Sequence, residues 1–246
     1  MSKLYAGTSG FAYPAWKPAF YPEKLAAKKF LSYYATRLNS VEVNYTFRRL
    51  ASASTLEGWI GETPADFVFA LKAHQKITHF QRLGESDFNE VFFRSIEPLR
   101  LQKRLGPVLF QLPPQFSADP ARLEAFLRQT PKDIRCAFEF RNKSWLVEPV
   151  YELLVQHGAA LCLAESEKLV IPERITADFV YFRLRKADYS PEERAEIGER
   201  AREMVAGGRD VYLFFKHEDT PEGALYAEEL LGMDSAAGRS IPDLGT

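Results

Sequence analysis

Acidic, basic and amide side chains follow apolar runs along this chain, and their types suit proton transfer on a negatively charged molecule. A glutamate can exchange a proton with a substrate when its surroundings tune its pKa, and arginine or lysine pairs with phosphate or carboxylate groups. The polar residues at the ends of these runs are Glu42, Asn44, Lys72, Gln111, Glu139, Arg141, Glu165, Arg183, Arg185 and Lys216.

Residues 134–145 show the pattern most clearly. They begin as a β-branched and aromatic run typical of a strand and end in a polar cluster typical of a loop. Alternate side chains of a strand share a face, so Ala137, Glu139 and Arg141 point one way, and this face is charged only at its C-terminal end. We expect this pattern where the end of a strand faces a ligand; an ion pair between Glu139 and Arg141 at a sheet rim is the alternative.

Eight apolar runs alternate with helical segments, which predicts an α/β fold with a parallel sheet buried on both faces. We expect a single (β/α)8 TIM-like barrel over residues 1–233 and a flexible tail over residues 234–246, with a doubly wound sheet as the alternative. Residues 166–177 show no amphipathic period, so the sixth βα unit is expected to be irregular.

Helix starts are predicted from capping-box spacing, which occurs three times. One long helix is expected over residues 88–103. The spaced pairs are Ser54 and Glu57, Asp87 and Glu90, and Ser190 and Glu193.

Side chains alternate between the two faces of a strand, so residues two positions apart share a face. On seven of the predicted strands the polar residues at the C-terminal end fall on the same face, so we expect them to lie close together. Burying such groups costs a few kcal/mol for each one left unpaired, so they form either a closed network or a ligand site. We expect a ligand site.

Two further sets of residues are candidate ligand contacts. An N-terminal Gly-Thr-Ser-Gly turn that includes Thr8 and Ser9 could point backbone N–H groups at an anion. Trp145, with Tyr13 or Trp16, could stack on a sugar or base. Packing in the core or in a loop is the alternative for each aromatic residue.

The overall composition excludes several classes of protein. The 246 residues are 46% hydrophobic with a net charge of −1, so total charge gives no case for nucleic-acid binding, although a local basic groove is compatible with it. No signal peptide or membrane span is recognisable, which predicts a cytoplasmic protein. Cys136 and Cys162 lie in apolar runs and are expected to be buried reduced thiols.

No metal and no cofactor is predicted. Divalent cations need anionic and imidazole ligands without competing cations, whereas lysines and arginines outnumber the glutamates at the strand ends. His74, His79 and His217 have neither HxH nor HExxH spacing, and Walker, Rossmann and nucleophile-elbow motifs are absent from the sequence.

Several short blocks occur in one order along the chain. They are Gly7-Thr-Ser-Gly, Phe20-Tyr-Pro, Val41-Glu-Val-Asn44, Lys72, Ile77-Thr-His79, Phe110-Gln-Leu-Pro-Pro114, Phe138-Glu-Phe-Arg141 with Ser144-Trp145, and Val180-Tyr-Phe-Arg183. Together they resemble the YecE-like family, also called domain of unknown function 72, over about residues 4–232. The resemblance implies a TIM barrel similar to that of endonuclease IV and xylose isomerase, with no established activity.

This chain differs from the familiar family pattern at two places. Arg183-Leu-Arg185-Lys186 stands where Arg-x-His-Gly is expected, and Lys216-His217-Glu218-Asp219 stands where an Asn-rich turn is usual. Both changes add charge at the expected barrel mouth.

Three hypotheses for function follow. The first is a metal-independent hydrolase, lyase or isomerase that acts on a phosphorylated or otherwise anionic small molecule, with Glu139 or Glu42 as acid or base and the remaining polar strand ends as substrate contacts. The second is a non-catalytic protein that binds nucleic acid or nucleotides. The third is a metal-dependent enzyme like endonuclease IV or xylose isomerase. The sequence gives no indication of oligomeric state.

Overall fold

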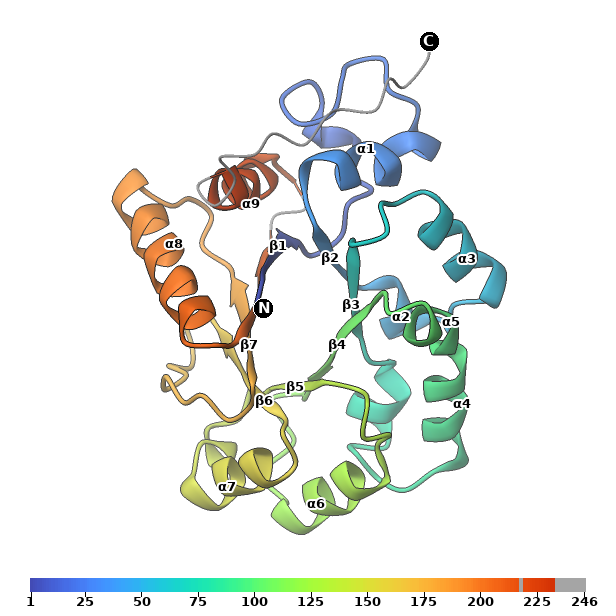
Figure 1. Ribbon diagram of the computed structural model, residues 1–246. Helices are drawn as coiled ribbons and strands as arrows, with labels where there is room; N and C mark the ends of the chain where they lie inside the picture. Colours follow the sequence, from blue (N-terminus) through green and yellow to red (C-terminus); the bar gives the residue numbers. More distant parts are fainter. Residues whose placement is uncertain (217–218, 233–246) are drawn as a thin grey trace.

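Eight parallel strands form a nearly closed barrel in the computed structural model, which describes residues 1–216 and 219–232 (Figure 1). Along the sheet, each strand pairs with the next one in the chain from the second strand to the eighth, and the eighth pairs with the first. The strands are β1 (Leu4–Thr8), β2 (Ser40–Val43), β3 (Val68–Lys72), β4 (Leu105–Gln111), β5 (Cys136–Glu139), β6 (Ala160–Ala164), β7 (Phe179–Leu184) and β8 (Asp210–Phe215).

The barrel closes where β1 meets β2 at the C-terminal end. The backbone N–H of Gly10 donates to the carbonyl oxygen of Glu42 at 2.8 Å, and Ser9 forms an isolated parallel bridge with Glu42. Gly7 permits this approach because a Cβ there would lie 1.9 Å from the Ser40 carbonyl oxygen. This closure excludes the doubly wound alternative.

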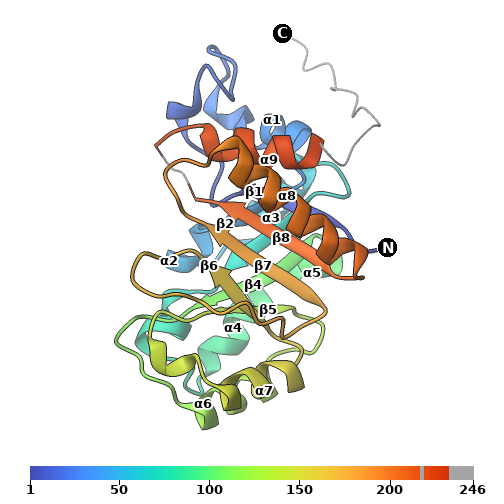
Figure 2. The same cartoon turned by 90° about the vertical axis from the view of Figure 1, so that its left-hand side faces the viewer.

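Helices surround the barrel (Figure 1), and the last two of them lie beside β8 and β1 (Figure 2). The α-helices of the described residues are α1 (Phe30–Arg37), α2 (Tyr45–Arg48), α3 (Ala53–Gly61), α4 (Asp87–Ser95), α5 (Glu97–Leu101), α6 (Pro120–Gln129), α7 (Glu148–Gln156), α8 (Pro191–Ala206) and α9 (Glu222–Gly232). Residues 165–178 connect β6 to β7 without a helix. Among the described helices, none is long and apolar enough to cross a membrane.

The helix starts predicted from the capping-box spacing at Ser54 and Asp87 are each displaced from the observed N-cap. Ser52 caps α3 by accepting from the Thr55 N–H, and Ser86 caps α4 by accepting from the Phe88 N–H. The capping box of Ser190 is confirmed.

The long helix expected over residues 88–103 is two helices, α4 and α5. Pro98 lies in the first turn of α5. Proline has no N–H with which to continue the hydrogen bonding of α4, so the helix is interrupted between α4 and α5.

Two apolar layers pack on the two faces of the sheet. The outer layer lies between strands and helices, and the inner layer fills the barrel with residues such as Ala70, Ala137 and Tyr181. Cys136 belongs to the outer layer and Cys162 to the inner one, and both are buried and free, as predicted.

The inner layer fixes which polar strand ends point into the barrel mouth. Ala70, Ala137 and Tyr181 point inward. Residues two positions apart on a strand share a face, so Lys72, Glu139 and Arg183 point inward as well. The predicted inward direction of Glu165 is wrong. Leu163, two residues before it, packs in the outer layer, so Glu165 lies on the outward face of the sheet.

Candidate functional site at the barrel mouth

Glu42 on β2 is fully buried and accepts three hydrogen bonds. Its Oε1 accepts from Ser9 Oγ at 2.7 Å and from Arg183 Nη2 at 2.7 Å, and its Oε2 accepts from Tyr181 OH at 2.8 Å. Burial raises the pKa of Tyr181 well above its usual range, so the phenol stays protonated and donates.

Glu139 at the end of β5 is bound by four donors. Burial alone would raise the pKa of Glu139, but the charge of Arg183, followed by those of two further arginines, holds this pKa well below its usual range. Its carboxylate is therefore ionised at neutral pH. The donors are Arg183 Nη1 at 2.5 Å and Gln111 Nε2 at 2.9 Å to Oε2, and Arg185 Nη2 at 2.8 Å and Arg141 Nε at 3.2 Å to Oε1.

Arg183 bridges the two carboxylates across the mouth. Its guanidinium is almost fully buried and contacts both Glu42 and Glu139. A divalent cation that contacted both carboxylates would have to displace this group. In the part of the chain that the structure describes, no three His, Cys, Asp or Glu side chains gather as a metal site; His217 lies outside that part.

Positive charge exceeds negative charge around this pair. Lys72, Arg141 and Arg185 stand near the two carboxylates in addition to Arg183, and each contributes to the electrostatics of the site. Burial, followed by the charge of Arg183, lowers the pKa of Lys72 to about 8. The site therefore has more cationic groups than its own carboxylates neutralise.

Two guanidinium groups also have hydrogen-bonding capacity left over. The Nε–H groups of Arg183 and Arg185 are buried and have no partner among the described residues. An unpaired buried donor costs roughly 1–3 kcal/mol, and at Arg185, which lines the adjoining pocket, a bound anion would recover this cost.

A pocket of about 670 Å³ adjoins this cluster. Its polar wall includes Glu139, Arg141 and Arg185, and its apolar wall includes Leu169 and Ile171 from the helix-free connection after β6. A volume of this size suits a small organic molecule, with the arginines at one side to fix its orientation.

Glu165 supports Arg185 from the outer side of the sheet. Its Oε2 accepts from the Arg185 backbone N–H at 2.6 Å and also from Tyr189 OH. Glu165 thus holds the backbone that follows β7, and it also lines the pocket, so its predicted contact with a substrate stays a prediction.

The aromatic residue predicted to stack on a ligand lies in the core. Trp145 is fully buried, its ring stacks on Phe140 with centroids 4.9 Å apart, and its Nε1 donates to the Phe116 carbonyl oxygen at 2.7 Å. Trp16 is also fully buried. Neither ring presents a face for stacking on a base or sugar.

The N-terminal turn is occupied by contacts within the protein. The backbone N–H groups of Thr8, Ser9 and Gly10 donate to Tyr34 OH, the Phe215 carbonyl and the Glu42 carbonyl, respectively. The turn therefore closes the barrel and positions Ser9 against Glu42, and it does not offer these N–H groups to an anion.

The remaining predicted contacts lie at the rim. Tyr13 is half-buried and its OH donates to the Ser9 carbonyl at 2.9 Å. Asn44 is half-buried after β2, and its buried Oδ1 has no partner among the residues that the structure describes; Lys216 is exposed after β8.

Sequence reasoning missed two groups in the site. Tyr181 lies two residues before Arg183 and points inward with it. The alternation of side chains indicates this direction, but Tyr181 lies within an apolar run and was not recognised as a polar contact. Phe47 on the unexpected short helix α2 lies with its ring centroid 4.2 Å from Lys72 Nζ and 5.1 Å from the His79 ring. No periodic pattern in the sequence predicts that one-turn helix.

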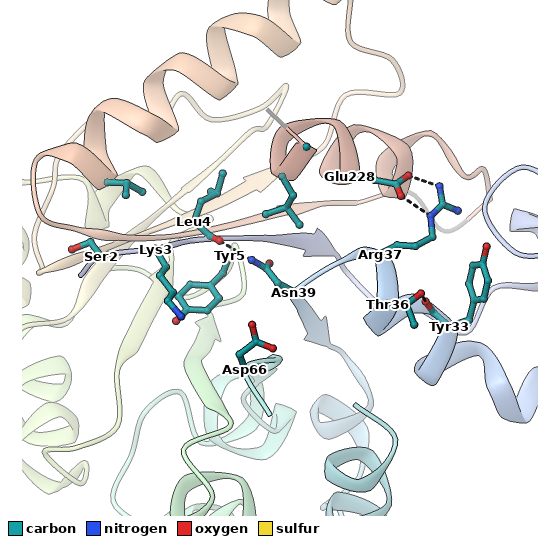
Figure 3. A pocket seen from close by; sticks show the side chains of 13 residues that line it. Ser2, Lys3, Leu4, Tyr5, Tyr33, Thr36, Arg37, Asn39, Asp66 and Glu228 are labelled. Atoms are coloured by element: carbon teal, nitrogen blue, oxygen red, sulfur yellow. Dashed lines mark hydrogen bonds and ion pairs between the residues drawn. The ribbon is translucent and has the colours of Figure 1, made fainter. Parts of the chain in front are cut away.

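A second pocket, of about 800 Å³, lies at the opposite end of the barrel (Figure 3). Arg37 there pairs with Glu228, and Asn39 Nδ2 donates to the Leu4 carbonyl at 2.8 Å. These groups are satisfied by contacts that join α1 to α9 and the start of β2 to β1. This end of a (β/α)8 barrel usually serves stability.

Comparisons with known proteins support the fold. A family model described as "Protein of unknown function DUF72" matches residues 5–243. The chain is 36% identical over 158 residues to UPF0759 protein YunF of Bacillus subtilis, a match that covers 61% of this chain and 54% of that protein, about half its length.

Two solved structures are also similar. A DUF72 family protein of Thermotoga maritima, TM1631, has a TM-score of 0.81 at 31% identity over 94% of this chain and 98% of that one. An AP endonuclease of family 2 from Brucella melitensis has a TM-score of 0.52 at 9% identity, covering 89% and 93% of the two chains, a similarity of fold alone.

Proposed function

This chain belongs to the DUF72 family of proteins of unknown function, and from that premise we propose that it is an enzyme acting on a small phosphorylated or carboxylated molecule at the C-terminal mouth of its barrel. The observation that supports the proposal is the set of three arginines that share two buried carboxylates beside the pocket. Arg183 and Arg185 each keep a buried Nε–H without a partner in the described chain, and Arg141 and Arg185 line the pocket wall.

Anion binding and proton transfer are coupled in this proposal. An anion that attracts Arg141 and Arg185 competes with Glu139 Oε1 for their hydrogen bonds. Losing two cationic partners raises the pKa of Glu139, so its carboxylate becomes a better proton acceptor when the substrate is bound. The acid–base role of Glu139, with Glu42 as its partner across Arg183, is part of this proposal.

The two alternatives have less support. The buried Trp16 and Trp145 leave a nucleic-acid binder without these stacking surfaces. The Arg183 guanidinium occupies the position between the carboxylates that a metal-dependent enzyme would need for its cation.

Thermal unfolding with matched ligand pairs tests the proposal. Glycerol 3-phosphate and ribose 5-phosphate should raise Tm, whereas glycerol and ribose should not. At a concentration ten times the dissociation constant, the rise is about 3–6 °C for a domain of this size. An equal response to both members of each pair would contradict the proposal, and a rise caused only by a single-stranded oligonucleotide would favour the nucleic-acid alternative.

A further inference from the structure

Lys72 is placed to present its amine to the barrel mouth. It is the last residue of β3, and Ala70, two residues before it, is fully buried in the inner layer opposite Glu42. Its carbonyl oxygen accepts from Thr46 Oγ1 at 2.7 Å, which fixes the end of β3 against α2. The side chain is half-buried.

The amine has no carboxylate partner within the described residues. The nearby carboxylates of Glu42 and Glu139 are bound by arginines, and Lys72 Nζ lies instead over the Phe47 ring, 4.2 Å from its centroid. The aromatic face stabilises the cationic form and fixes the position of the amine without supplying a counter-charge.

The surroundings favour the neutral amine. Burial and the charge of Arg183 lower the pKa of Lys72 to about 8. At pH 7 roughly one molecule in ten then has a free amine at this position, against roughly one in 2,500 for an ordinary lysine. Desolvation and a neighbouring cation are the two means by which proteins make lysine nucleophilic.

We infer that Lys72 is a catalytic nucleophile that forms an imine with the carbonyl carbon of an anionic substrate held by Arg141 and Arg185. The inference rests on the proposed function and narrows its substrate class to anionic aldehydes or ketones. The amine lone pair attacks the carbonyl carbon, and the carbonyl oxygen takes up the proton that the nitrogen loses. The resulting carbinolamine loses water to give the imine, and water reverses the step.

Reductive trapping on the native protein tests the inference. The probe is pyridoxal 5′-phosphate, an aldehyde with a phosphate group, reduced with borohydride after brief exposure at pH 7; hydride converts the imine to a stable secondary amine, and peptide mapping by mass spectrometry locates it. Lys72 should be labelled at least tenfold faster than Lys28, an exposed lysine. Inorganic phosphate should slow the labelling of Lys72 and not of Lys28. Propanal, which has no anionic group, serves as the second probe.

The outcomes separate this inference from the proposed function. Preferential labelling of Lys72 by propanal, with no protection by phosphate against pyridoxal 5′-phosphate, would support the nucleophile and contradict the anion site. Labelling of Lys72 at the rate of Lys28 by both probes would overturn the inference, while a Tm rise with glycerol 3-phosphate would keep the proposed function. In the Lys72→Arg variant the fast-reacting site should disappear.

Discussion

Glu139 accepts hydrogen bonds from Gln111 and three arginines, so its negative charge holds several side chains of the mouth in place. We expect Glu139→Gln to lower the free energy of unfolding at pH 7 by about 3–5 kcal/mol, the cost of removing one partner from a buried ion pair. Chemical denaturation measures the difference. The variant should also bind phosphate more tightly, because the arginines lose a competitor.

The pH dependence of stability should change in the same variant. The pKa of Glu139 is depressed in the folded protein, so its contribution to stability is full above the ordinary carboxyl pKa of about 4.3 and is lost as the pH falls below it. Between about pH 5 and pH 2 the native protein should lose stability more steeply than Glu139→Gln. Parallel curves for the two proteins would argue against an ionised Glu139 in this network.

Trp145 contributes to packing, and its substitution should affect stability alone. Trp145→Phe removes the donor to the Phe116 carbonyl oxygen and leaves that buried acceptor unpaired, a loss of about 1–3 kcal/mol. The rise of Tm with phosphate should equal that of the native protein. If phosphate no longer stabilised Trp145→Phe, the ring would contribute to ligand binding after all.

At the scale of elements, closure of the barrel depends on the approach of β1 to β2. In Gly7→Ala the new Cβ would meet the Ser40 carbonyl oxygen, so the strands must separate and the contact of Ser9 with Glu42 must shift. We expect a loss of about 3 kcal/mol or more, of the size seen for severe overpacking, measured by urea denaturation. Gly58→Ala in α3, where a Cβ meets nothing within 4 Å, is the matched control and should gain about 0.5–1 kcal/mol. Similar effects of the two substitutions would contradict this account of closure.

The elements also show how far the sequence could predict this fold. Alternating apolar runs and helices were sufficient to predict a parallel barrel, and period-two parity placed Glu42, Glu139 and Arg183 at its mouth, because buried strands leave few other arrangements. Glu165 was misplaced because a short strand followed by a loop gives no parity signal beyond its last apolar residue. Trp145 was misassigned because composition does not distinguish a loop aromatic that packs in the outer apolar layer from one that faces a ligand.

At the scale of the whole molecule, the net charge of −1 conceals a local excess of positive charge. Arginines and lysines from β3, β5 and β7 meet at one end although they are distant in sequence, so only the fold brings them together. A concave site with an excess of positive charge attracts anions. Which donors remain unpaired within residues 1–216 and 219–232, such as Arg185 Nε, depends on side-chain geometry that sequence parity does not specify.

Calorimetric titration with inorganic phosphate tests the anion site most directly. The site variant is Arg141→Gln combined with Arg185→Gln, which removes two pocket guanidinium groups while leaving Arg183 between its carboxylates. Arg128→Gln, at an exposed arginine of α6, removes the same kind of charge elsewhere. We predict saturable binding at one site in the native protein and in Arg128→Gln, and binding at least tenfold weaker in the double variant, because a hydrogen bond from a charged group contributes about 1.5–3 kcal/mol. Equal affinity in all three proteins, or no saturable binding to the native protein, would contradict an anion site at the barrel mouth.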